Sequence, residues 1–321
     1  MSEPSLVVFA PSPLLTITVE AADTPRQEIH LHAGGQGFWV SRMAALLGAQ
    51  VGLCCSLGGE SGTVLRALIA REHVMLLEAR CAAANGVYVH ARRDGVREEL
   101  ARTVSRGLTR HEVDELYGVM LSAALDAPLA MLTGVDPPGV LESDVYRRLA
   151  GDLKANGVKV IADLSGGALR AALDGGLDLL KLSDEELLRE GLASGTDVDD
   201  LLRGAALLHE AGARTVLISR AQAPSLVLDG ASGCCLALSG PRVEPLEHRG
   251  AGDSMFAALG ASLAADDDLT SALRVAMAAG CLNATRHGLG TGTREQIQRL
   301  SHHIEVEEVI APRPRASPAR Q

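Results

Sequence analysis

The chain has 321 residues, 47% of them hydrophobic, and a formal net charge of −10 at pH 7. This length and apolar content allow a sizeable buried core and exclude a disordered body. Aromatic residues make up 2% of the chain, and an acidic surface repels a phosphate backbone, so stacking platforms and basic patches for nucleic acid are missing. We therefore expect no nucleic-acid partner.

The six cysteines include two adjacent pairs, Cys54-Cys55 and Cys234-Cys235, within apolar runs. Adjacent cysteines do not have metal-ligand spacing, and on a strand they point to opposite faces. We interpret them as small buried side chains in a reducing compartment. The chain shows no signal peptide and no apolar run of transmembrane length, so we expect a cytoplasmic protein without a membrane partner.

The first third of the chain predicts a buried strand at 5–10, which ends at Pro11. Period-two alternation at about 15–20, 28–33 and 86–101 predicts strands with one covered face, which we assemble into a small lid sheet. Between them we expect a helix at 38–47, a strand at 51–57, a helix at 61–72 and a strand at 74–77.

From Thr109 onward, apolar strands alternate regularly with helices. We expect helices at 109–125, 140–156 and 198–211, and strands at 129–133, 158–163, 177–182 and 215–219. This alternation predicts an α/β fold, a doubly wound, mostly parallel sheet with helices on both faces. A hairpin at 225–228 and 234–238 and helices at 254–265 and 269–286 follow. We expect one domain over 1–311 and a disordered, Pro- and Arg-rich tail at 312–321.

A glycine turn at 250–253 runs into an apolar helix. Gly250 and Gly252 leave the backbone uncovered, so several amides can converge on an anion where the helix dipole also favours negative charge. Asp253 is suited to accept a proton from a hydroxyl that attacks that anion. Taken alone, the pattern is more often an ordinary turn with an acidic helix start.

Five motifs in one order give this turn more weight. They are Gly34-Gly35-Gln36-Gly37 ahead of a helix with Arg42, and the segments 57–62, 132–139, 181–187 and 250–254. With them the chain resembles the PfkB/ribokinase family of carbohydrate kinases over about 6–305. The resemblance is closest to the 1-phosphofructokinase and tagatose-6-phosphate kinase branch, and it implies a ribokinase-like fold with a small β-sheet lid.

The resemblance also implies an ATP- and Mg²⁺-dependent kinase that phosphorylates a hydroxyl of a sugar, a sugar phosphate or a related small molecule. Asp253 is then the base, and the backbone amides of Ala251, Gly252 and Asp253 hold the transferring γ-phosphoryl group, with Gly250 as part of the same catalytic turn. Glu186 supports the metal through water. The nucleotide side is expected to include Lys181, Ser183, Glu186, Ser219, Arg220, Arg249 and Asn283. The acceptor side is expected to include Thr16, Gly34, Gly35, Gln36, Trp39, Thr133 and Gly134.

Several acceptor-side positions depart from the family pattern. Thr16 replaces an Asp that binds sugar hydroxyls, and Gln36 replaces a Lys that pairs with phosphate. Trp39 stands where a small polar residue usually meets the sugar, and the phosphate-binding Arg of the lid is missing near Gly86 or Val87. These changes favour a flatter or less polar substrate, such as a nucleoside-like one, over a phosphorylated sugar.

The nucleotide side departs as well. Ser183 replaces the Asn of an Asn-x-x-Glu motif, and His248 replaces a Thr ahead of the glycine turn. The loop at 219–224 lacks the glycines that allow close approach to a phosphate, although Arg220 and Arg249 offer charge in return.

Two other functions deserve comparison with an active kinase. A kinase-fold protein that has lost turnover and binds a ligand or partner would explain the departures, but the retained base and anion hole favour the enzyme. A nicotinamide-dependent oxidoreductase is rejected, because Pro11-Ser12-Pro13 replaces the glycine motif that should follow the first strand. The exposed edges of the lid strands also make a homodimer through the lid plausible.

Overall fold

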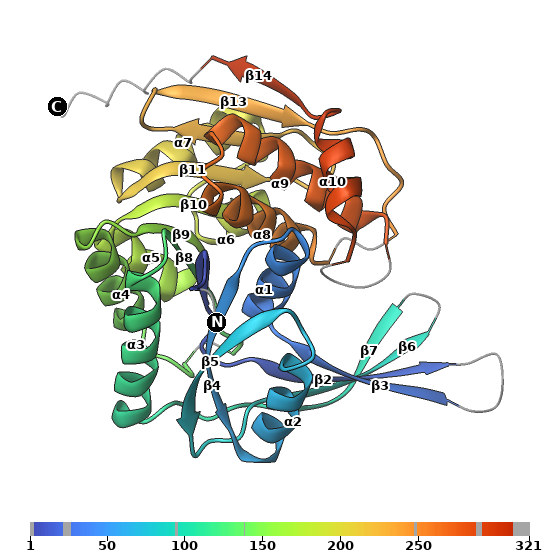
Figure 1. Cartoon of the computed structure of the whole chain (residues 1–321). Coiled ribbons are helices and arrows are strands. Elements are labelled where there is room, and N and C mark those ends of the chain that lie inside the picture. The colour runs from blue at the N-terminus through green and yellow to red at the C-terminus, as the bar shows by residue number, and fades with distance from the viewer. Residues whose placement is uncertain are drawn as a thin grey trace.

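The computed structural model describes residues 3–21, 27–93, 96–137, 139–246, 249–286 and 291–310. These residues form two sheets, one of ten strands and one of four. In Figure 1 the large sheet runs through the body of the molecule, and the small sheet projects from it as an arm. The expected tail at 312–321 and His248 lie outside the described residues.

The large sheet has the strand order β14-β13-β12-β11-β10-β9-β8-β1-β4-β5. Its parallel strands are β1 (Leu6–Phe9), β4 (Val51–Gly58), β5 (Val74–Cys81), β8 (Leu129–Thr133), β9 (Lys159–Asp163), β10 (Leu177–Ser183) and β11 (Ala213–Ser219). An antiparallel edge follows, with β12 (Ser225–Asp229), β13 (Cys234–Ser239) and β14 (Glu305–Val309). The chain leaves β1 toward β4 on one side and later returns to β8 on the other. The topological switch point, where such sheets bind ligands, therefore lies between β1 and β8.

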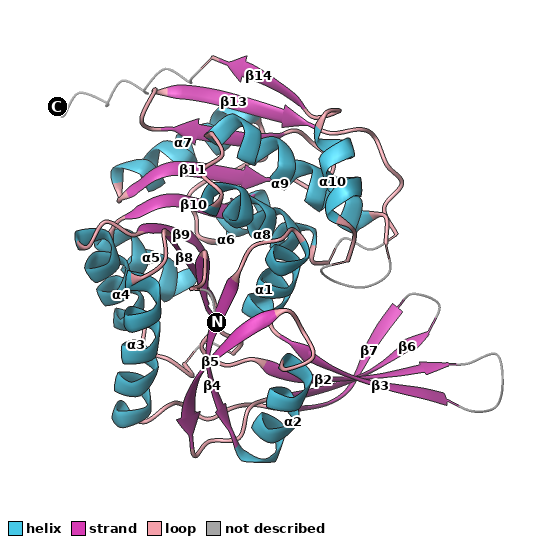
Figure 2. Cartoon of the chain, viewed as in Figure 1, coloured by secondary structure: helices cyan, strands magenta, loops and turns pink. Residues whose placement is uncertain are grey.

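Helices cover both faces of this sheet (Figure 2). One face packs against a helix group made of α3 (Arg110–Leu125), α4 (Asp144–Ala155), α5 (Gly166–Gly175), α6 (Asp184–Arg189) and α7 (Val198–Glu210). The other face packs against α1 (Gln36–Leu46), α8 (Ala251–Ala264), α9 (Leu269–Ala284) and α10 (Arg294–Ser301). Helix α2 (Gly59–Ile69) fills a third apolar cluster between β4 and the small sheet.

The small sheet, the lid, has the strand order β3-β2-β6-β7. Its strands are β2 (Leu14–Ala21), β3 (Gln27–Gly34), β6 (Val87–Arg93) and β7 (Val96–Thr103). Alternation gives the lid one apolar face. At the root of the lid the residues of this face, Leu15 and Ala33, are buried, whereas farther out Ile29 and Leu31 are 63% and 46% exposed. The opposite face is polar.

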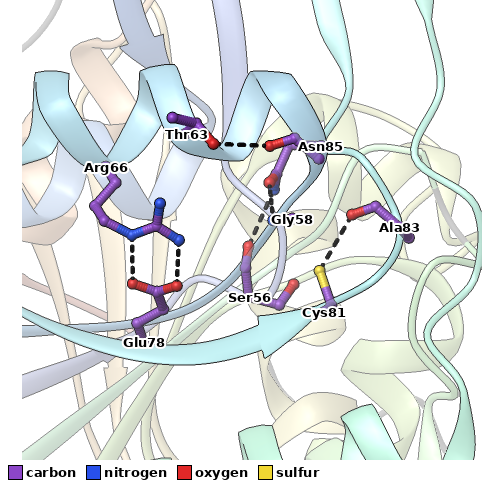
Figure 3. Close-up of polar contacts among 9 residues, drawn as sticks. Ser56, Gly58, Thr63, Arg66, Glu78, Cys81, Ala83 and Asn85 are labelled. Carbon is purple, nitrogen blue, oxygen red and sulfur yellow. Dashed lines mark hydrogen bonds and ion pairs between the residues drawn. The ribbon is translucent and has the colours of Figure 1, made fainter.

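Asn85 ties the root of the lid to the body, and its side chain is drawn in Figure 3. It is 3% exposed, and its Nδ2 donates to the carbonyl oxygens of Pro13 (3.1 Å) and Ser56 (3.0 Å). Its Oδ1 accepts from the Gly58 amide at 2.9 Å, and its carbonyl accepts from Ser61 Oγ at 2.7 Å. Asn85 thus holds together the two points at which the chain enters the lid and the turn before α2.

The structure confirms the expected doubly wound sheet, the helices on both faces and the separate lid sheet. Cys54 and Cys55 are buried on opposite faces of β4, as expected. The expected start of the helix at 140 is wrong: Val140 lies in a loop, where its carbonyl accepts from the Leu108 amide, and α4 begins at Asp144. The third lid segment, expected at 86–101, is a hairpin of two strands, β6 and β7. The structure also contains α5, which begins and ends in glycines, the short helix α6, α10 and β14, none of which was expected.

Candidate active site

The turn before α8 presents a ring of backbone amides. Gly250 is the N-cap of α8 with φ 76°, a left-handed conformation that favours glycine, and no side chain caps the helix there. The first intrahelical bond runs from the Ser254 amide to the Gly250 carbonyl at 2.9 Å. The amides of Ala251, Gly252 and Asp253 come before it in the helix, so they are positioned to donate to an anion.

Helix α9 fixes the turn from behind. Asn283 on α9 is fully buried, its Nδ2 donates to the carbonyl oxygen of Arg249 at 3.0 Å, and its Oδ1 accepts from Ser254 Oγ at 3.1 Å. Gly280 on the same helix lets it approach closely, because a Cβ there would lie 3.2 Å from the carbonyl oxygen of Ala251. The amide ring is therefore held by packing before any ligand arrives.

A buried ion pair lies beneath the turn. Lys181 on β10 pairs with Asp163 at the end of β9, with Nζ and Oδ2 2.8 Å apart and both side chains at most 6% exposed. Burial acts to lower the pKa of Lys181, but the charge and hydrogen bond of Asp163, together with the charges of Glu186 and Asp253, raise it. A Cβ on Gly252 would come within 2.8 Å of Lys181 Nζ, so glycine at 252 allows this cation to approach the amide ring.

Asp253 lies beside this pair at the start of α8 and is partly buried. Burial raises the pKa of its carboxyl to about 7, and the negative charges of Asp163 and Glu186 act in the same direction. Lys181 and hydrogen bonding from Gln36 oppose the rise. A carboxyl with a pKa near neutrality is well matched to accept a proton under physiological conditions.

Glu186 is fixed by a capping box at the start of α6. Its Oε2 accepts from the amide and from the hydroxyl of Ser183, both at 2.8 Å, while Ser183 Oγ accepts from the Glu186 amide at 3.2 Å. Ser183 therefore caps α6, as an Asn also would at this position. Among the described residues, no group of three or more acidic, His or Cys side chains is arranged to hold a metal ion. This donor set fits Mg²⁺ bound largely through water and phosphate, with Glu186 beyond the water.

A cavity of about 280 Å³ opens at the switch point between β1 and β8. Its lining comes from the loops after these two strands and from the start of α1, and includes Ser12, Gln36, Phe38, Gly134 and Asp136. Gln36 lines this cavity, and its Oε1 accepts from the Gly134 amide at 2.9 Å. Gln36 is also among the groups that act to lower the pKa of Asp253.

The sequence and the fold both match one family of known proteins. The profile of the pfkB family carbohydrate kinases matches residues 15–296. The chain belongs to this family. ATP-dependent 6-phosphofructokinase isozyme 2 of Escherichia coli is 30% identical over 284 residues, which cover 87% of each chain. The 1-phosphofructokinase of Vibrio cholerae is 28% identical over 276 residues, or 86% of each chain.

Solved structures show the same ribokinase-like fold. Phosphofructokinase-2 of Escherichia coli in complex with potassium superposes with a TM-score of 0.82 and 25% identity, over 93% of this chain and 98% of that one. Arabidopsis thaliana ribokinase complexed with ribose and ATP has a TM-score of 0.73 at 20% identity, over 94% and 99%. This PfkB chain is thus similar along almost its whole length to kinases that act on sugars.

The lid of this PfkB kinase carries cations toward the turn. His90 on β6 is 2% exposed, and its Nε2 lies 3.3 Å from Oγ1 of Thr18. Burial lowers the pKa of His90, and the positive charges of Arg97, Arg92 and Arg249 act in the same direction. Because Arg249 belongs to the glycine turn, the polar face of the lid and the turn lie within electrostatic reach of each other.

An ion pair also joins the lid to the rim of the cavity. Arg102 on β7 stacks on the ring of Tyr88 at 4.8 Å, and its Nη1 lies 3.0 Å from Oδ2 of Asp136. Asp136 lines the cavity in the loop after β8. The pair therefore links β7 of the lid to the loop that forms the rim of the cavity.

The expected nucleotide-side residues do not all face open space. The guanidinium of Arg220 is 12% exposed, donates to the Thr196 carbonyl at 2.8 Å and lies 3.9 Å from Asp184. It thus braces the loops after β11 and before α7. Ser219 donates to the Leu182 carbonyl at 3.4 Å, whereas the side chain of Arg249 is exposed. With Asn283 buried behind the turn, Arg249 is the best placed of these side chains to meet an anion.

The expected acceptor-side residues also separate into two groups. Gly35, Gln36 and Gly134 line the cavity. Thr133 is fully buried and donates to the Phe9 carbonyl at 2.7 Å, so its side chain braces the switch point. Thr16 and Gly34 are neighbours at the lid root, where a Cβ on Gly34 would lie 2.5 Å from Thr16 Oγ1.

Trp39 lies apart from the cavity. Its ring packs edge-on to Phe38 with centroids 5.1 Å apart, lies under Arg42 at 5.7 Å, and joins the apolar cluster below the lid. The described cavity lining includes Phe38 but not Trp39. The structure therefore gives no support to the inference from Trp39 of a flat, nucleoside-like substrate.

Three residues of the site were missed in the sequence. Asp163 ends a buried strand directly beside Lys181, and an acidic residue at the carboxyl end of an apolar strand is the signal that indicates it. Asn85 and Arg102 have no comparable sequence signal, because their partners at 13–61 and at 136 are distant in the chain.

Proposed function

We propose that this PfkB kinase transfers the γ-phosphoryl group of ATP to a hydroxyl of a small carbohydrate, with Asp253 as the general base. The observation that carries the proposal is the position of Asp253. Asp253 stands in the first turn of α8, at the amide ring and within electrostatic reach of the buried Lys181, and the loops around the switch point enclose a cavity of about 280 Å³. A phosphoryl anion and an attacking hydroxyl can thus meet beside one proton acceptor.

Each part of the site has a role in this proposal. The amides of Ala251, Gly252 and Asp253 hold the phosphoryl oxygens, and Lys181 below them adds positive charge without contact with solvent. Ionised Asp253 accepts the proton of the acceptor hydroxyl, and the charges of Asp163 and Glu186 strengthen it as a base. Mg²⁺ bound to the phosphates would neutralise their charge, with Glu186 holding one of its waters.

The acceptor that we propose is a phosphorylated sugar. Arg97 and Arg92 of the lid and Arg249 of the glycine turn act together on His90, although Arg92 also pairs with Glu20, and this positive charge on a protein of net charge −10 favours an anionic acceptor. The relatives named 6-phosphofructokinase and 1-phosphofructokinase support the same class. The lid cations would take over from the Lys that Gln36 replaces.

The proposal is tested by ADP release from ATP and Mg²⁺ with a panel of fructose 1-phosphate, fructose 6-phosphate, tagatose 6-phosphate, free sugars and nucleosides. We expect turnover of a phosphosugar, and we expect Asp253→Asn to lower kcat by roughly 10³-fold or more while nucleotide binding persists. Turnover of nucleosides alone would refute the acceptor class. Undiminished activity of Asp253→Asn would refute the role of the base, and a protein that binds ATP without turnover of any acceptor would be the impaired kinase.

We also propose that two copies pair through their lids. The apolar face of the lid exposes Ile29 and Leu31, and a second lid is a natural cover for it. Sedimentation of the protein as a monomer at micromolar concentration would contradict this.

A cytoplasmic location is also proposed. It is supported by the six cysteines, all of which are free thiols. In the parts of the chain that the structure describes, no helix combines the length and the apolar character needed to cross a membrane.

A further inference from the structure

The loop after β8 begins at a peptide group that is held at both of its ends. Its carbonyl belongs to Thr133, the last residue of β8, and accepts from the Tyr146 hydroxyl at 3.0 Å. Its N–H belongs to Gly134 and donates to Oε1 of Gln36 at 2.9 Å. Because a peptide group is planar, one hydrogen bond at each end fixes the rotation of the whole group.

The side chains around this peptide group are themselves fixed by packing. Tyr146 on α4 is 1% exposed, and its ring packs edge-on against Phe9 with the centroids 5.7 Å apart. Thr133 is fully buried, and its hydroxyl donates to the carbonyl oxygen of Phe9 at 2.7 Å. Gln36 begins α1, and Gly37 after it allows close approach, since a Cβ there would lie 2.7 Å from Thr133 Oγ1. The ends of β1 and β8 and the helices α1 and α4 therefore meet at one peptide group.

The chain that follows this peptide group forms part of the cavity wall. Gly134, Val135 and Asp136 line the cavity, and so does Gln36. Glycine at 134 tolerates backbone conformations that other residues avoid, so a rotation of the peptide group would redirect Val135 and Asp136. Asp136 also pairs with Arg102 of the lid at 3.0 Å. The orientation of this peptide group thus affects both the cavity wall and the contact with the lid.

We propose that Tyr146 is a positioning residue for acceptor binding, which together with Gln36 holds the Thr133–Gly134 peptide group in the orientation that shapes the cavity. The described lining of the cavity does not include Tyr146, so Tyr146 acts through the carbonyl of Thr133 and not by contact with the acceptor. The proposal rests on the function proposed above, in which this cavity receives the acceptor.

Tyr146→Phe tests the role of the hydroxyl, because it removes the bond to the Thr133 carbonyl and keeps the ring that packs against Phe9. Tyr117→Phe is the matched control. Tyr117 on α3 is also buried, and its hydroxyl donates to Asp152 on α4, neither of which lines the cavity. The two variants lose the same chemical group, but only one of them loses a bond to the peptide group.

We expect the KM of the phosphosugar to rise about 3- to 10-fold in Tyr146→Phe, the factor that corresponds to one typical hydrogen bond, while kcat and the KM for ATP stay within about twofold. Tyr117→Phe should leave all three constants unchanged. Both variants should lower Tm by a few degrees, because each removes one buried hydrogen bond. An acceptor KM that is unchanged in Tyr146→Phe, or that rises equally in the control, would overturn the proposal while leaving the proposed function intact.

Hydrogen exchange of the Gly134 amide gives a second readout that needs no turnover. In ¹⁵N-labelled protein, Gly134→Ala assigns the signal, since a Cβ there meets Gln36 Oε1 at an ordinary contact distance of 3.5 Å. We expect exchange at Gly134 to be about tenfold faster in Tyr146→Phe than in the wild type and in Tyr117→Phe. Faster exchange in Tyr146→Phe alone supports the proposal, and equal exchange in all three proteins would refute it, whether or not the protein turns over an acceptor.

Discussion

The reaction centre and the lid hold their charges in opposite ways. At the reaction centre, Lys181 and Asp163 are at most 6% exposed, and the turn above them is fixed by buried Asn283. On the lid, Arg102 pairs with Asp136 while their side chains are 35% and 70% exposed. Buried pairs are rigid and costly to break, whereas exposed pairs contribute little to stability and exchange partners with water and ions.

This difference separates the chemistry from the choice of acceptor. A rigid, desolvated centre preserves one reaction, so its residues cannot be changed singly without large losses. The lid is anchored at its root by buried Asn85, but the contact of Arg102 with Asp136 is exposed and can be altered with little loss of stability. The departures at Thr16 and Gln36 and in the lid thus lie around a centre that keeps the turn from Gly250 to Asp253.

The largest loss of stability is expected from Lys181→Met, which removes one partner of the buried ion pair. It leaves the Asp163 carboxylate buried without its partner, and such a change costs about 3–5 kcal/mol of the free energy of unfolding. Lys159→Met is the control, because the pair of Lys159 with Asp266 is exposed and should be worth at most about 1 kcal/mol. Denaturant unfolding at pH 7 measures both variants, and equal losses would contradict the contrast between buried and exposed pairs.

Gly252→Ala should damage catalysis more than folding. A Cβ at 252 would meet Lys181 Nζ at 2.8 Å, and the displaced cation would disturb the amide ring. We expect kcat to fall about 100-fold, the loss typical of one disturbed donor at a developing charge. Gly118→Ala is the matched control, since a Cβ there meets nothing within 4 Å and alanine favours its helix. Steady-state kinetics that show the two variants alike would contradict the role of Gly252.

Asp253→Asn should stabilise the free protein at neutral and alkaline pH. The pKa of Asp253 is about 7 in the folded protein, above the ordinary value of 3.8, so the folded state binds its proton more tightly than the unfolded chain. The contribution of this group to stability is therefore lost as pH rises from about 4 to about 7. Without Mg²⁺ and nucleotide, we expect the Tm of the variant to exceed that of the wild type by a few degrees at pH 8, with the difference vanishing near pH 4. An equal difference at both pH values would contradict the raised pKa.

The smallest effect is expected at the lid. Arg102→Ala removes the ion pair with Asp136 and should raise the KM of the acceptor a few-fold, with kcat and Tm nearly unchanged. Arg147→Ala is the control, because Arg147 forms an exposed pair with Asp144 away from the lid. A kcat loss as large as that of Gly252→Ala would show that the lid is part of the reaction centre.

The sequence by itself determined the doubly wound sheet, the presence of a separate lid sheet and the turn at 250–253, but not that the third lid segment is a hairpin. These features depend on local patterns, namely continuous apolar strands, period-two alternation and glycines at a helix start, which short segments carry alone. The family and its kinase activity followed from the order of five such motifs. Two helices lacked a pattern strong enough to predict them: α5, which begins and ends in glycines, and α10, which is short.

Only the tertiary structure shows where the expected residues lie relative to the cavity and the glycine turn. Trp39, Thr133 and Asn283 fit the motif positions, yet they pack inward. Asp163, Asn85 and Arg102 acquire their roles from contacts 18 to 73 residues away in the chain. The raised pKa of Asp253 and the bond from the Gly134 amide to Gln36 depend on atoms that folding brings together, so no local pattern records them.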